Sequence, residues 1–243
     1  MLLEGNVSVK AAILAGNRQV ETVYYDMDKK DKDLQFILYR AKERNIACIA
    51  CKRDKINEMA TGRTHGGLVA IAGDRQIQSL SDCLKTKNPF LVLLEGVEDP
   101  FNLGYIVRTL YSAGCHGLIL PKHDWSRVES TITKSSAGAY EYMPIVMSDD
   151  LPGIVDDIQK QGIHTFAAMR KDAISYLDGD YRQPCMLAIG GEMRGLSSAV
   201  LKKIEKNIYI PYANDFRNAL NAASASAVLS FEVYRQRLTC MQK

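Results

Sequence analysis

The sequence lacks any apolar run that approaches the roughly 20 residues of a membrane-spanning helix. Its first residues, MLLEGNVSVKAAILAGN, lack both a basic segment and a long apolar core, so they do not indicate a signal peptide. The chain also has little excess charge, because 31 Lys and Arg stand against 28 Asp and Glu. This balance neither requires nor excludes a nucleic-acid partner, since phosphate binding needs a local basic patch more than a high total. We expect a cytoplasmic protein that does not enter a membrane.

Paired cysteines are scarce. Of the six cysteines, only Cys48 and Cys51 form a C-x-x-C pattern, within the stretch NIACIACK. This stretch has the composition of a β-strand, in which residues three apart point to opposite faces. No second pair completes a zinc site. We therefore predict no metal site, and we expect reduced thiols that are mostly buried.

A polar segment divides the chain, and helix and strand patterns recur on both sides of it. Before it, helices and strands are expected in alternation at residues 6–16, 19–26, 32–45, 46–51, 54–62 and 67–73. We predict a small α/β domain at residues 1–74, a linker at residues 75–88 and a larger domain at residues 89–243.

The larger region begins with FLVLLEG, an apolar run with little alternation that is typical of a strand covered on both faces. Strands are expected at residues 90–96, 117–120, 142–147, 164–169, 185–191 and 207–211. Helices are expected at residues 102–114, 126–136, 151–161, 197–203 and 218–237. This alternation indicates a mainly parallel sheet, whose ligands bind in the loops that follow the carboxyl ends of its strands.

The first such loop lies in EDPFNLGYIVRTLYSAG, after the strand at residues 90–96. We interpret Asn102 as the N-cap of the helix that follows. Gly104 and Arg108 are four residues apart and share one helix face, so the glycine leaves open space in front of the arginine. The alternative interpretation of Arg108 is a solvated surface charge.

The second loop follows the strand at residues 185–191 and contains Gly190, Gly191, Glu192 and Gly195. Glycine lets a backbone turn tightly and approach a ligand closely. The spacing G-G-x-x-x-G differs from the dinucleotide fingerprint G-x-G-x-x-G, which disfavours a NAD-binding enzyme.

The third loop follows Ile210 and leads into a helix expected to start near Asn218. Small residues are frequent in that helix, and they permit close approach of a cofactor or a chain segment. We place Asn221 in the first turn, where its amide reaches the polar edge of a ligand.

Together, the three loops resemble the SpoU (TrmH-like) branch of the SPOUT RNA methyltransferases. NLGYIVR is similar to the first motif of that family, IGGEMRGL to the second, and IPYANDFRNALNAASASA to the third. KSSAGAYEYMPI matches a further family stretch. The order and spacing of the motifs agree over residues ~90–237.

The resemblance implies a parallel-sheet SPOUT domain with a deep trefoil knot. It also implies a bent S-adenosylmethionine (AdoMet) within the knot, a homodimer, and methyl transfer to a ribose 2′-hydroxyl of RNA. The catalytic residues are then Arg108, Asn102 and Glu192. The AdoMet-binding residues are then Gly190, Gly191, Gly195, Ile210, Leu220 and Asn221. Because a guanidinium does not ordinarily give up a proton, Arg108 is expected to clamp a phosphate, and Glu192 to act as base or to orient Arg108.

The N-terminal domain resembles the ribosomal-protein-like RNA-binding domain that members of this family carry, through EGNVSVKAAI and THGGLVAIA. This resemblance favours ribosomal RNA as the substrate over transfer RNA. Candidate contacts to RNA phosphates are Arg18, Lys52, Arg53 and Arg63.

The third motif departs from the family pattern. It is one residue longer, Asn214 and Asp215 replace a glycine region, and Ala219 and Ala223 replace serines. This departure keeps open the alternative of a non-catalytic RNA-binding protein that kept the fold. A transfer-RNA 2′-O-methyltransferase is the other alternative.

Overall fold

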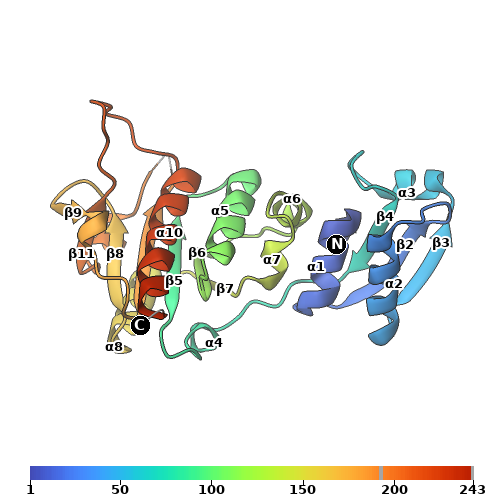
Figure 1. Cartoon of the computed structure of the whole chain (residues 1–243), viewed down its shortest axis with the longest axis horizontal. Helices are drawn as coiled ribbons and strands as arrows, with labels where there is room; N and C mark the ends of the chain where they lie inside the picture. The colour runs from blue at the N-terminus through green and yellow to red at the C-terminus, as the bar shows by residue number, and fades with distance from the viewer. Residues whose placement is uncertain (192–193, 242–243) are drawn as a thin grey trace. The chain divides into compact units, whose positions relative to one another are not determined.

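The computed structural model describes residues 1–191 and 194–241, with side chains up to Thr239 (Figure 1). The chain divides into two compact units. The first unit comprises Met1–Gln76 and Asp124–Tyr142, and the second comprises Ile77–His123 and Met143–Lys243.

The first unit contains a four-stranded sheet with the strand order β1-β4-β2-β3. The β2 and β3 strands are parallel, whereas β4 is antiparallel to both β1 and β2. Its elements from residues 1–76 are β1 (Leu2–Glu4), α1 (Gly5–Ala15), β2 (Val20–Asp26), α2 (Lys32–Glu43), β3 (Ala47–Cys51), α3 (Arg53–Met59) and β4 (Leu68–Ala72). The alternation expected from the sequence is confirmed. The β1 strand was not anticipated because its three residues are too few to show a periodic pattern.

The cysteine pattern agrees with this sheet. Cys48 and Cys51 both lie on β3, where Cys48 is exposed and Cys51 is half-buried. Cys83, Cys115 and Cys185 are buried free thiols. Burial raises the pKa of the Cys83 thiol to about 11, so this group stays protonated at neutral pH.

The segment at residues 124–142 interrupts the second unit in sequence but packs with the first. It contains α6 (Glu129–Ser135) and α7 (Ala139–Tyr142), and α1 packs against both helices. The predicted helix at 126–136 is thus present as α6, and its partners come from the N-terminal part of the chain.

A buried ionic cluster joins this segment to residues 1–76. The Arg18 guanidinium donates from Nε to Glu141 at 2.8 Å and from Nη1 to Glu129 at 3.1 Å, and none of its side chain is exposed. Thr133 donates to the other Glu141 oxygen at 3.0 Å, and Tyr140 donates to Glu129 at 3.2 Å. Burial opposes the charge of Arg18, but Glu141 and Glu129 outweigh it and raise the pKa of Arg18. Arg18 and the two carboxylates therefore depend on one another for charge compensation.

The second unit is built on a seven-stranded parallel sheet with the order β7-β6-β5-β10-β8-β11-β9. Its strands are β5 (Phe90–Glu95), β6 (Gly117–Pro121), β7 (Ile145–Ser148), β8 (His164–Ala168), β9 (Ala173–Ser175), β10 (Cys185–Gly190) and β11 (Lys206–Tyr209). Six of these seven strands match the sequence expectation, and the exception is the three-residue β9. Residues Phe90–Leu94 of β5 are buried, as expected for a strand covered on both faces.

The helices of the second unit include α5 and α10, which pack side by side (Figure 1). The bounds are α4 (Leu80–Cys83), α5 (Pro100–Ser112), α8 (Leu151–Lys160), α9 (Ser198–Leu201) and α10 (Ala222–Met241), with a short 3₁₀ helix at Tyr176–Asp178. α10 also packs against β10. α5 follows β5 along the chain, so α10 packs against the helix after one central strand and against the other central strand itself.

Two predicted helix starts are wrong, and both errors concern site residues. Asp99 rather than Asn102 is the N-cap of α5, because Pro100 occupies the first turn and begins the helix earlier. α10 starts at Ala222 rather than near Asn218. No helix among the described residues combines the length and apolar character that a membrane span requires.

Candidate functional site

The loops after β5 and β10 cross each other backbone to backbone. The Gly191 N–H donates to the Glu95 carbonyl at 2.7 Å, and the Gly195 N–H donates to the Gly191 carbonyl at 3.0 Å. A Cβ atom on Gly191 would lie 1.8 Å from the Gly96 carbonyl oxygen, so only glycine fits at this crossing. The Ser197 N–H donates to the Glu95 carboxylate at 2.8 Å and holds the end of the second loop.

Two pockets flank this crossing. The first, here called the α5 pocket, has a volume of about 310 Å³ and is lined by Gly96, Val97, Glu98, Asp99, Asn102, Gly191, Arg194 and Ala222. The second, here called the β10 pocket, has a volume of about 430 Å³. Its lining includes Gly190, Gly191 and Gly195 from the second loop, and Ile210, Leu220 and Ala222 from the third. Gly191, Arg194 and Ala222 line both pockets, so a ligand in one lies next to a ligand in the other.

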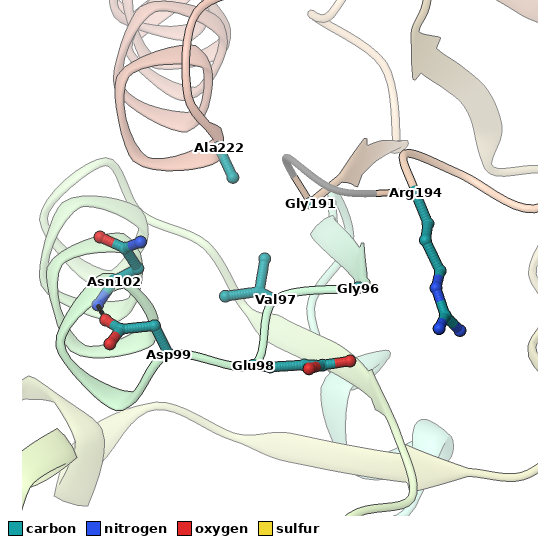
Figure 2. Close-up of a pocket in the computed structure, with 8 residues that line it drawn as sticks. All are labelled: Gly96, Val97, Glu98, Asp99, Asn102, Gly191, Arg194 and Ala222. Carbon is teal, nitrogen blue, oxygen red and sulfur yellow. Dashed lines mark hydrogen bonds between the residues drawn. The ribbon is translucent and has the colours of Figure 1, made fainter.

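Asn102 lines the α5 pocket from the first turn of α5, and it is half-buried. Its backbone N–H donates to the Asp99 carboxylate at 2.7 Å, while its side chain has no part in this cap (Figure 2). Figure 2 shows Asn102 and Arg194 on opposite sides of the pocket, with Val97 and Gly191 between them. The capping role given to Asn102 by the sequence pattern therefore passes to Asp99, and the Asn102 amide stays at a site where a ligand fits.

Arg108 lies on the exposed surface of α5 and is not among the described residues that line either pocket. At 3.6 residues per turn, its side chain leaves the helix about 120° away from that of Asn102. Gly104, one turn earlier, is buried. Arg108 is thus close to Asn102 in sequence, but its side chain lies on a different face of α5 from the one that lines the pocket.

Asn221 immediately precedes α10 and caps it. Its side-chain oxygen accepts from the Ser224 N–H at 2.8 Å, and its carbonyl accepts from the Ala225 N–H at 2.9 Å. The expected position in the first helical turn is wrong, because an asparagine amide satisfies the open N–H groups better from the position before the helix. Its neighbours Leu220 and Ala222 line the β10 pocket. Glu192, the remaining predicted catalytic residue, lies outside the described residues.

The predicted RNA contacts of the first unit separate into two groups. Lys52, Arg53 and Arg63 are exposed, and Arg53 Nη1 lies 3.3 Å from Asp26 Oδ2. Arg18 is buried and bonded to Glu129 and Glu141, so it is unavailable to a phosphate. The prediction for Arg18 was wrong because its short polar context, AGNRQ, does not show that two glutamates far along the chain surround it.

Several residues that line the pockets were not anticipated from the sequence. Arg194 lines both pockets, and Glu98 lines the α5 pocket. Arg170 and Tyr212 line the β10 pocket from the ends of β8 and β11. Arg194 and Glu98 stand inside the two motifs already singled out, so a count of charged residues in these loops would have found them. Arg170 has no motif around it, and only the strand order reveals it.

Comparisons with known proteins agree with this geometry. Residues 89–231 match the family model described as "SpoU rRNA Methylase family", and residues 2–78 match the one described as "RNA 2'-O ribose methyltransferase substrate binding". A protein of Staphylococcus haemolyticus assigned to the TrmH family of tRNA/rRNA methyltransferases is 30% identical over 244 residues, covering 98% of this chain and 96% of that protein. A Bacillus subtilis protein with the same assignment is 33% identical over 211 residues, covering 84% of this chain and 83% of its own.

Among solved structures, the SpoU methyltransferase AviRb from Streptomyces viridochromogenes in complex with AdoMet superposes with a TM-score of 0.82. The two sequences are 25% identical, and the match covers 98% of this chain and 91% of that one.

Proposed function

Because the chain belongs to the SpoU rRNA methylase family of AdoMet-dependent RNA methyltransferases, we propose that it methylates a ribose 2′-hydroxyl of ribosomal RNA. The observation that carries this proposal is the pair of adjoining pockets. The first motif lines the α5 pocket, and the second and third motifs line the β10 pocket and contribute to the α5 pocket as well. Such a pair places two ligands side by side, as a transfer between a cofactor and a large substrate requires.

The β10 pocket fits AdoMet. Ile189, Ile208 and Leu229 give it apolar walls suited to a nucleoside, and Gly190 and Gly191 line it without a side chain, so a ligand can approach the backbone there. Its volume lies within the range of small-molecule sites. When bound, AdoMet supplies an electrophilic methyl group on a sulfonium. Gly190, Gly191, Gly195, Ile210 and Leu220 are the residues that we propose hold it, with Asn221 fixing the start of α10.

The α5 pocket then receives the ribose. Asn102 offers an amide to the sugar hydroxyl or the adjoining phosphate, and Arg194 supplies a positive charge at the side shared with the β10 pocket. A poor nucleophile such as a ribose hydroxyl needs alignment and a proton acceptor. We retain Glu192 for the acceptor role or for orienting Arg108.

Arg108 enters this proposal through a homodimer. α5 exposes Phe101 and Tyr105 on the face that carries Arg108, at helical spacings of four and three residues. α10, which packs beside α5, exposes Phe231, Tyr234 and Leu238. Large apolar groups gathered on two adjoining helices are typical of a surface that a partner covers. We propose that a second copy covers it and that Arg108 of each copy acts at the pockets of the other, clamping an RNA phosphate.

The finer points of the proposal have separate support. The N-terminal match to a substrate-binding model favours RNA recognition by the domain at residues 1–74, with Lys52, Arg53 and Arg63 as phosphate contacts. Three further points stay predictions: the division into a linker at residues 75–88 and a domain at residues 89–243, the trefoil knot, and the cytoplasmic location. A transfer-RNA substrate is the second candidate, since the named relatives are tRNA/rRNA methyltransferases.

Incubation with AdoMet labelled at the methyl group tests the function directly. We expect label in ribosomal RNA rather than transfer RNA, recovered after nuclease digestion as a 2′-O-methylated nucleoside. RNA from cells that lack the gene is the appropriate acceptor because its target site is unmodified. Label on a base would refute ribose methylation, and AdoMet-independent RNA binding without transfer would identify a non-catalytic protein.

The capping residue Asn221 provides a test of the cofactor pocket. Asn221→Ala is expected to raise the dissociation constant of AdoMet about fivefold and to cost about 1 kcal/mol of stability, since α10 loses its N-cap beside Leu220 and Ala222. Asn221→Ser retains a good cap and serves as the matched control. Calorimetric titration separates two roles: a weak Ser variant indicates a direct amide contact, and a near-normal one indicates capping alone. An unchanged dissociation constant for the alanine variant would count against this pocket.

A further inference from the structure

The third loop has no secondary structure of its own to hold it against the cofactor pocket. Residues 210–221 form neither helix nor strand, and nearly all of them are exposed. Yet Ile210, Ala219 and Leu220 of this loop form one wall of the β10 pocket. The sequence of the loop also departs from the family pattern at residues 214, 215 and 219. Something other than the family's usual residues must fix this wall.

Arg170 and Tyr212 bridge the loop. The Arg170 guanidinium donates from Nη1 to the Arg217 carbonyl at 3.1 Å and from Nη2 to the Asn218 carbonyl at 3.4 Å. Its central carbon lies 4.6 Å from the centroid of the Tyr212 ring. The Tyr212 hydroxyl in turn accepts from the Leu220 N–H at 2.8 Å. One guanidinium and one phenol thereby bind backbone at both sides of Ala219.

The base of this bridge is attached to the sheet. β8 ends at Ala168, and Met169 separates it from Arg170. The Met169 N–H donates to the Ile208 carbonyl at 3.0 Å. The Asn207 side chain donates to the Lys171 carbonyl at 2.9 Å. The backbone on each side of Arg170 is therefore joined to β11, and the guanidinium reaches the loop from a fixed point.

We propose that Arg170 and Tyr212 are positioning residues for AdoMet binding, which hold residues 217–220 so that Ala219 and Leu220 keep their place in the wall of the cofactor pocket. The inference rests on the proposed function for the identity of the ligand. A planar guanidinium suits this task because it donates to two carbonyls and stacks on a ring at once, which an ammonium does not. The role concerns binding of the cofactor, so the chemical step at saturating AdoMet should be nearly independent of it.

The test compares AdoMet dissociation constants with single-turnover rates. Arg170→Met is expected to raise the dissociation constant about tenfold, through loss of two charge-assisted hydrogen bonds and a cation–π contact, while the rate at saturating AdoMet changes less than about twofold. Arg170→Lys should recover part of the affinity. Tyr212→Phe keeps the ring and loses the acceptor for Leu220, so a rise of about threefold is expected. Lys171→Ala removes the neighbouring exposed cation and should match the unaltered protein.

Coupling distinguishes this bridge from two unrelated surface contacts. Because Arg170 and Tyr212 hold the same loop, the effect of the double variant Arg170→Met with Tyr212→Phe should fall below the product of the single effects. Thermal melting of each variant controls for folding, and Tyr212→Phe remains informative if Arg170→Met does not fold. A dissociation constant for Arg170→Met within twofold of the unaltered protein would overturn the inference. Failure of the unaltered protein to methylate RNA would reject the proposed function alone, because AdoMet affinity is measured without RNA.

Discussion

Arg108→Ala is expected to lower the single-turnover rate of methyl transfer by about a hundred- to a thousandfold while AdoMet affinity stays within about twofold. The magnitude is that of removing one charged or hydrogen-bonding group that acts in the transition state. Affinity for AdoMet should survive because Arg108 is not among the described residues lining the β10 pocket. Ser112→Ala is the matched control, since Ser112 is exposed on the same helix and its hydroxyl donates to a carbonyl of that helix. A near-normal rate for Arg108→Ala would show that this arginine is dispensable.

Mixing two inactive variants determines whether Arg108 acts on its own chain or on a partner. Arg108→Ala keeps an intact cofactor pocket, whereas Leu220→Trp fills that pocket and keeps Arg108. If the arginine acts across a two-fold interface, random pairing leaves about a quarter of all sites complete, because half of the dimers are mixed and each has one good site. If it acts within its own chain, the mixture stays inactive. A mixture without activity, together with a monomeric protein in solution, would remove the homodimer from the proposed mechanism.

Arg18→Met is expected to lower the free energy of unfolding of the first unit by about 3–5 kcal/mol. The substitution removes the guanidinium that is bonded to the buried Glu129 and Glu141, and breaking a buried ion pair by removing one partner costs this much. Trp125 is the chain's one tryptophan, and it is buried in the same unit. Its fluorescence during urea denaturation therefore measures the transition.

The surface arginine Arg40 supplies the control for this experiment. Arg40 pairs with Glu43 at 2.8 Å, and both side chains are about two-fifths exposed. Arg40→Met should change stability by less than about 1 kcal/mol, as is usual for exposed pairs. Adding Glu129→Gln and Glu141→Gln to Arg18→Met should restore part of the loss, because neutral amides tolerate burial better than carboxylates. Equal stabilities for the Arg18 and Arg40 variants would contradict the importance of the buried cluster.

The sequence predicted those parts of the fold that local pattern determines. The run FLVLLEG indicated the buried β5 strand without any knowledge of its neighbours. The three loops at strand ends were correctly expected to converge, because carboxyl ends of parallel strands meet at one edge. The glycine spacing identified Gly191 as a site residue. Glycine is required there because the carbonyl oxygen of Gly96, almost a hundred residues earlier, leaves no room for a Cβ atom.

The parts that failed depend on choices between near-equal local alternatives or on distant partners. Asp99 and Asn102 are both good caps, and the presence of Pro100 between them decides in favour of the first. Asn218 and Asn221 present the same choice before α10, where the helix begins after the second. Arg18 looked like a surface cation because its glutamate partners are more than a hundred residues away. Neither propensity nor spacing contains that information.

The strand order has a consequence for how the protein is made. Phe90 of β5 pairs with Cys185 of β10, and β10 in turn pairs with β8. During translation, β5 therefore leaves the ribosome long before β10, the strand that joins it to β8. Pairings this distant in sequence form slowly, since a long loop must close before any contact rewards it. A nascent chain interrupted before residue 185 thus has neither a continuous central sheet nor the crossing on which both pockets depend.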